Sequence, residues 1–140
     1  MRSIFLGLAV AACLQSGGAL AEEAMFDQLQ AIDIDNANPE FVSDMFGTWT
    51  ISNAAGDKHC MVVLKRELTI GGMELELAPD CAARFPVLDD ITAWRLLEGW
   101  AIDLVDAERR TRIRFETPDD IYVAFPDTDG VFTIQPAPRG

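Results

Sequence analysis

From Gly47 to near the C-terminus, apolar residues recur at every second position, which is the period of a half-buried β-strand. Further strands are expected at residues 91–97, 121–125 and 131–134. About eight short strands joined by turns predict an all-β fold, and eight are enough to close an antiparallel up-and-down barrel of the lipocalin type. The alternating positions are Trp49 and Ile51; Cys60, Val62 and Leu64; Met73, Leu75 and Leu77; Trp100, Ile102 and Leu104; and Thr111, Ile113 and Phe115.

The positions expected to point inward carry large side chains. These inward positions are occupied by Trp49, Trp100, Phe115 and several leucines and isoleucines. Their combined volume suits the interior of an eight-stranded barrel. We therefore predict a barrel filled by its own side chains. The alternative is an aromatic pocket of the kind that a lipocalin-like carrier of small ligands needs.

Glycines mark two of the expected turns. Gly71 and Gly72 separate two strand patterns and predict a hairpin there. Gly130 ends the stretch Asp127-Thr128-Asp129-Gly130, which partly matches an EF-hand loop but has no glutamate at the twelfth position. A hairpin turn with Gly130 in the left-handed conformation explains this stretch better.

The N-terminus has the pattern of an export signal. A short positive start precedes the apolar run Ile4 to Ala12, and the small residues Ala19 and Ala21 precede Glu22. We expect a signal peptide at 1–21, an N-terminal tail at 22–46, a barrel domain at 47–140 and a periplasmic product. The alternative is an outer-membrane lipoprotein, because Val10 to Cys13 is similar to a lipobox and acylation at Cys13 would attach the chain to a membrane.

Cleavage after Ala21 removes Cys13 and leaves Cys60 and Cys81 as an even pair in an oxidising compartment. We predict that they form a disulfide, which would stabilise the fold by about 3 kcal/mol in the chain-entropy model. His59 is the only histidine, and no metal-ligand spacing accompanies it. We expect no metal site and no cofactor.

The tail at 22–46 lacks the strand period. Met25, Leu29 and Ile32 are spaced to share one face of a helix, and Asn38-Pro39-Glu40 predicts an N-cap followed by proline at the first helical position. We therefore expect a partly helical tail with up to two short helices.

Charge and composition narrow the function classes. The formal net charge is −12 at pH 7, so the chain should repel nucleic acid and anionic membranes. A lone histidine gives no nucleophilic triad, and the paired acids Asp89-Asp90 and Asp119-Asp120 fall at expected turns, where solvated carboxylates are common. We expect a monomer that is not an enzyme.

An ordered set of motifs between Gly47 and about Tyr122 resembles the Inh family of bacterial metalloprotease inhibitors, which includes the alkaline protease inhibitors and a related outer-membrane lipoprotein. The set combines a Gly-x-Trp start, two cysteines and later tryptophans. It comprises Gly47-Thr48-Trp49, Cys60-Met61-Val62-Val63-Leu64, Cys81, Trp94, Gly99-Trp100, Leu104-Val105-Asp106 and Ile113-Arg114-Phe115.

The resemblance implies an eight-stranded barrel with one disulfide that inhibits secreted zinc metalloproteases of the serralysin type. In that family an extended N-terminal tail lies in the protease cleft and its first residues approach the catalytic zinc. Carried over, this role falls on Glu22, Glu23, Ala24 and Met25, which are acidic where the smallest inhibitors begin with small hydroxyl residues. The tail is also longer than theirs.

Overall fold

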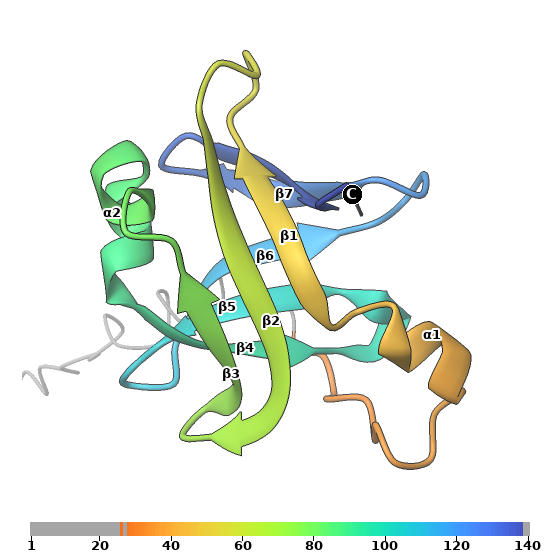
Figure 1. The fold of residues 1–140 in the computed structure, drawn as a ribbon. Coiled ribbons are helices and arrows are strands. Elements are labelled where there is room, and N and C mark those ends of the chain that lie inside the picture. Colours follow the sequence, from red (N-terminus) through yellow and green to blue (C-terminus); the bar gives the residue numbers. More distant parts are fainter. Residues whose placement is uncertain (1–25, 27, 139–140) are drawn as a thin grey trace, which may run out of the picture.

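The computed structural model describes Phe26 and residues 28–138, and within them the chain forms eight antiparallel strands that close into a barrel (Figure 1). The strands follow one another in sequence order, and β8 pairs back with β1. This confirms the predicted all-β up-and-down barrel. The strands are β1 (Gly47–Ser52), β2 (His59–Thr69), β3 (Gly72–Leu77), β4 (Ile91–Leu96), β5 (Ile102–Asp106), β6 (Thr111–Glu116), β7 (Tyr122–Thr128) and β8 (Val131–Pro136).

Short helical elements precede β1 and lie in two of the connections between strands. Helix α1 lies beside the N-terminal end of β1, and α2 lies on the opposite side of the barrel in this view (Figure 1). They are α1 (Pro39–Ser43), α2 (Cys81–Arg84), and the 3₁₀ turns η2 (Pro86–Asp90) and η3 (Glu98–Trp100).

The predicted hairpin turns are confirmed. Thr69 pairs with Gly72 across the β2–β3 turn, and Gly71 has φ of +92°. Across the β7–β8 turn, Asp129 and Gly130 both have positive φ, 49° and 86°. Two successive residues with positive φ match the right-handed twist of the paired strands, which is why Asp-Gly is favoured there.

The barrel interior is filled by side chains from all around the sheet, as predicted. Trp49 is 3% exposed and its indole N–H donates to the carbonyl of Met45 at 3.0 Å. Its ring also meets Tyr122 edge-on, with centroids 5.6 Å apart. The other large buried residues include Ile51, Leu64, Trp94, Leu96, Ile102, Leu104, Ile113, Phe115 and Ile134.

The predicted disulfide is present. Cys60 on β2 is bonded to Cys81 at the start of α2, with Cα atoms 5.2 Å apart. The bond therefore ties the chain that follows β3 back onto β2. The two cysteines are separated by 21 positions in the sequence. Closing a loop of this length lowers the entropy of the unfolded chain and so stabilises the fold.

The helical expectation for the tail was right for one part and wrong for another. Asn38 caps α1, since its side chain accepts from the backbone N–H of Glu40 at 3.0 Å and Pro39 follows at the first position. Residues 28–33, however, are not helical, so Leu29 and Ile32 do not share a helix face. Such a short segment is a marginal helix, and here a strand edge offers it backbone hydrogen bonds instead.

The expectation for Trp100 was also wrong. Trp100 lies in η3, before β5, and is half-buried against the core from outside the strand pattern. Its φ is +62°, which is unusual for a bulky residue. A turn at Gly99 with φ of +74° reverses the chain just before it, and this breaks the alternation that begins at Ile102.

Candidate functional site

The structure distributes the predicted site residues between scaffold and rim. Trp49 and Trp94 are buried in the barrel, Gly47 opens β1, and Trp100 lies at the rim. These residues do not converge on a single pocket; they build the scaffold. The tail residues Glu22 to Met25, together with the signal peptide and Cys13, lie outside the described residues, so their roles and the domain boundaries stay predictions.

The base of the tail is attached to the open edge of β4. Strands β3 and β4 share one paired position, Met73 with Trp94, so the backbone of β4 beyond Trp94 is available on that side. The N–H of Ile32 donates to the carbonyl of Leu96 at 3.0 Å. Ala31 and Leu97 form an antiparallel bridge between these segments.

The attachment continues one residue further along each chain. The N–H of Glu98 donates to the carbonyl of Gln30 at 2.8 Å, and the N–H of Gln30 donates to the Glu98 carboxylate at 3.3 Å. The tail thus pairs with the barrel through an isolated β-bridge just before η3. This contact fixes where the chain N-terminal to Gln30 begins.

A buried ion pair lies on the outer face of β5 and β6. Asp103 and Arg114 are register partners, and their side chains are 1% and 5% exposed. The Arg114 guanidinium donates to both Asp103 oxygens, at 2.7 and 2.9 Å, and the Thr111 hydroxyl donates to one of them at 2.8 Å. The Arg114 Cζ atom lies over the Phe26 ring, 5.3 Å from the ring centroid.

Sequence reasoning missed this pair. The alternation puts Asp103 and Arg114 on the face opposite Leu104 and Ile113, and the outward face of an antiparallel sheet is commonly solvated. The available signal was an acid and a base on neighbouring predicted strands. Without the register, that signal could not be distinguished from ordinary surface charge.

The half-buried phenol of Tyr122 contacts the backbone of Trp100, whose φ is positive. The Tyr122 hydroxyl donates to the Trp100 carbonyl at 2.7 Å, and burial raises the pKa of Tyr122 to about 12, so the hydroxyl keeps its proton. Phe41, which is 58% exposed on α1, meets the Trp100 ring edge-on at 6.0 Å. These aromatic residues line the rim beside the tail base.

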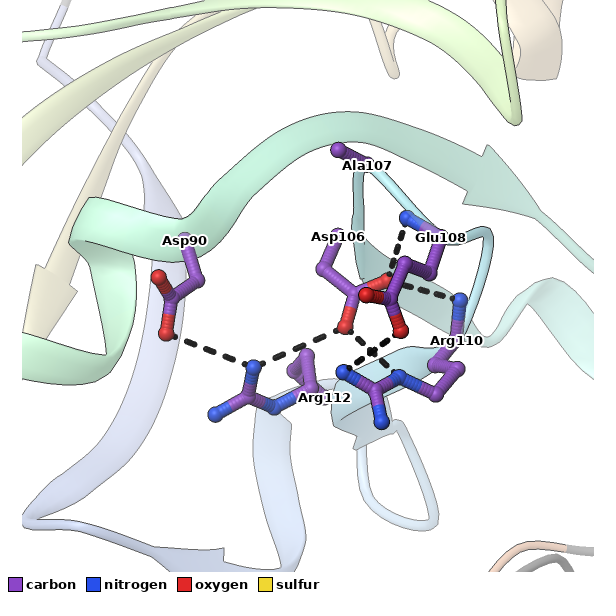
Figure 2. Close-up of a pocket in the computed structure, with 6 residues that line it drawn as sticks. All are labelled: Asp90, Asp106, Ala107, Glu108, Arg110 and Arg112. Carbon is purple, nitrogen blue, oxygen red and sulfur yellow. Dashed lines mark hydrogen bonds and ion pairs between the residues drawn. The ribbon is translucent and has the colours of Figure 1, made fainter.

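A shallow pocket beside the β5–β6 turn is lined by charged residues. Figure 2 shows Arg112 between Asp90 and Asp106, while Arg110 reaches both Asp106 and Glu108. Asp106 accepts from the backbone N–H groups of Glu108 and Arg110 at 2.9 and 3.0 Å. It therefore shapes the turn that joins the two strands.

The charge state of Asp106 follows from two opposed effects. Burial acts to raise its pKa, but the hydrogen bonds from Arg110 and from the backbone of Glu108 lower it on balance. The carboxylate stays ionised and matched by arginine. The pocket is thus a network that supports the turn.

The part of the chain that the structure describes offers no observation in favour of a metal site or a catalytic site. There, no group of three or more histidine, cysteine or carboxylate side chains could hold a metal ion. His59 is exposed and shares a hydrogen bond of 3.0 Å with the Ser52 hydroxyl. The acid pairs at 89–90 and 119–120 are exposed, as expected for turn residues. None of the helices among the described residues is long and apolar enough to cross a bilayer.

The fold and the site define a small protein that is closed and filled inside and that presents a tail fixed at its base. The family model described as Protease inhibitor Inh matches residues 40–134. The chain therefore belongs to the Inh family of protease inhibitors, as the sequence motifs indicated. This family consists of inhibitors and not of enzymes, and its partner is a protease. No curated protein matches the chain.

Proposed function

We propose that this protein inhibits a secreted zinc metalloprotease of the serralysin type, and that its mature N-terminal residues enter the protease active-site cleft. The observation that carries this proposal is the match of residues 40–134 to a family of protease inhibitors. The metalloprotease target and the role of the tail rest on the resemblance described above.

The filled barrel supports a function carried by the outer surface of the protein and not by its interior. Residues such as Trp94, Phe115 and Ile134 are fully buried in the interior, which leaves that space to the protein core. A carrier of small ligands needs an open lumen, so this observation favours inhibition over transport.

The attached tail base supports a cleft-binding role in energetic terms. Ordering a flexible segment costs about 1 to 2 kcal/mol per residue in backbone entropy. Gln30, Ala31 and Ile32 are already paired with residues 96–98 at the end of β4, so binding has to order only the residues before them. Preorganisation at the base therefore favours tight binding.

The chemistry at the zinc falls on the first residues of the processed chain. Cleavage after Ala21 gives Glu22 a free α-amino group, whose ordinary pKa of about 7.7 to 8.0 leaves it partly neutral near pH 7. A neutral amine, a carbonyl oxygen or the Glu22 carboxylate can donate to zinc at the position that water occupies in a catalytic site.

The scaffold suits a protein that works beside active proteases. Proteolysis proceeds from opened states, and a closed barrel exposes few strand edges from which to open. The disulfide between Cys60 and Cys81 lowers the opened population further. We propose a periplasmic location, where the inhibitor protects the exporting cell. Mass spectrometry of the exported protein tests this location. An N-terminal Glu22 would support the periplasmic product, and an N-terminal acylated Cys13 would support the outer-membrane lipoprotein instead.

The proposed activity is tested by titrating the mature protein against secreted zinc, serine and cysteine proteases. We expect stoichiometric inhibition of a serralysin-type zinc enzyme and none of the others. Inhibition of a serine or cysteine protease alone would refute the zinc-directed mechanism. A failure to inhibit any protease in all three classes would refute the proposed function.

A further inference from the structure

The outer face of a small soluble barrel is normally wet, yet Asp103 and Arg114 are both buried there. The inward positions of the same strands are taken by Ile102, Leu104 and Phe115, so the ion pair lies outside the core. The pair is also fully hydrogen-bonded, with the bidentate contact and the Thr111 hydroxyl described above.

Barrel stability alone gives little reason to keep such a pair. Removing two charges from water costs several kcal/mol per ion, and replacing a buried pair with apolar residues of similar size is often neutral or stabilising. Buried ion pairs are better understood where they specify one arrangement of the chain among several. The question is therefore what arrangement Asp103 and Arg114 specify.

The nearest answer is the placement of Phe26. Two parallel hydrogen bonds to Asp103 fix the plane of the Arg114 guanidinium, and a fixed plane offers one face to an aromatic ring. The Cζ atom of Arg114 lies over the Phe26 ring, 5.3 Å from the ring centroid. A cation–π contact is stronger when the cation is desolvated, as Arg114 is.

Phe26 and the pairing at Gln30 to Ile32 hold the tail at two separate places. One is the outer face of β6, and the other is the end of β4. Two fixed points define a direction, whereas one point leaves the segment free to pivot. The described part of the tail therefore has a set position up to Phe26.

We propose that Arg114, oriented by Asp103, is a positioning residue of the inhibitor: it holds Phe26 and so aims the N-terminal segment. This inference rests on the proposed function for its effect on inhibition, while the anchoring itself is a property of the free protein. Its contribution lies in preorganisation, because Arg114 need not touch the protease.

The test compares three substitutions at Phe26 in the mature protein. Phe26→Tyr keeps the ring face, Phe26→Leu keeps an apolar side chain without the ring, and Phe26→Ala removes both. Amide hydrogen exchange of Gln30 and Ile32, which donate in the tail pairing, reports anchoring without any protease. Buried barrel amides serve as the internal control.

We expect wild-type exchange for Phe26→Tyr and exchange about fivefold faster at the tail amides of the Phe26→Leu and Phe26→Ala variants, since a cation–π contact is worth roughly 2-fold at an exposed site and roughly 30-fold when it is desolvated. The melting temperature should stay within about 2 °C of wild type, since a cost confined to the tail is small on the scale of barrel unfolding. Unchanged exchange in both Leu and Ala variants overturns the anchor.

Inhibition constants of the same variants test whether the anchor contributes to inhibition. Phe26→Leu and Phe26→Ala should weaken inhibition about fivefold, and Phe26→Tyr should inhibit like wild type. Faster tail exchange with unchanged inhibition overturns the positioning role. If the wild-type chain inhibits no protease, the proposed function fails, and the exchange data still decide whether Arg114 anchors the tail.

A double substitution, Asp103→Leu with Arg114→Met, removes the ion pair itself. We expect a folded barrel whose tail amides exchange as fast as those of Phe26→Ala. Wild-type tail exchange in a folded double variant overturns the proposal. If this variant does not fold, the Phe26 series still decides the outcome.

Discussion

Replacing Trp49 with alanine should cost the barrel a large part of its stability. The side chain is 3% exposed, its N–H donates to the Met45 carbonyl, and its ring meets Tyr122 edge-on. Removing a buried large aromatic costs about 3 to 5 kcal/mol, because the cavity is only partly filled by relaxation. For a barrel of this size, that corresponds to a fall of roughly 10 to 25 °C in melting temperature.

A matched variant separates packing from hydrogen bonding. Trp49→Phe keeps an aromatic ring and leaves the Met45 carbonyl without its indole donor, so it should cost about 1 to 3 kcal/mol. Denaturant unfolding followed by circular dichroism measures both variants. If Trp49→Ala unfolds within about 1 kcal/mol of wild type, the packing described here is wrong. A Phe variant as damaged as the Ala variant would show that the hydrogen bond dominates.

Three further predictions concern the scaffold. Replacing both Cys60 and Cys81 with serine should destabilise the barrel by about 3 kcal/mol, and alkylation of the unreduced mature protein should label no thiol; two labelled cysteines would contradict the oxidised state. Gly72→Ala should cost roughly 1 to 3 kcal/mol by denaturant unfolding, because its Cβ would clash with the Trp94 carbonyl oxygen, and a neutral effect would disprove this close approach. The pKa of Asp106 lies below its ordinary value of 3.8, so its stabilisation is present above that value and is lost as the pH falls through the folded-state pKa. The stability gap between wild type and Asp106→Asn should therefore be full at pH 7 and shrink below pH 3.8; a gap independent of pH would rule out this role.

The barrel could be predicted because burial and strand period agree. In β2, Cys60, Val62 and Leu64 alternate with more exposed residues, and the turn at Gly71 is set by a local backbone requirement. Such signals lie within a few residues of one another in sequence, so they survive without knowledge of the partner strands.

The features that position the tail could not be predicted, because they depend on register and on long-range contacts. Leu29 and Ile32 fit a helix by spacing, and the extended form wins because β4 has an unpaired edge near Leu96. The contact between Asp103 and Arg114 likewise exists only once β5 and β6 are aligned. Trp100 was mispredicted for a different reason: the chain reverses at Gly99, and this reversal takes Trp100 out of an alternation that is otherwise correct.

The central claim is that the residues before Phe26 carry the inhibition. It is tested most directly by the inhibition constants of two chains against one zinc metalloprotease, one beginning at Glu22 and the other at Phe26, with both tail anchors kept. We expect equal melting temperatures and a loss of about 100-fold or more in affinity for the shorter chain, equivalent to about 2.7 kcal/mol. Equal inhibition by the two chains would contradict it and assign the activity to the barrel rim.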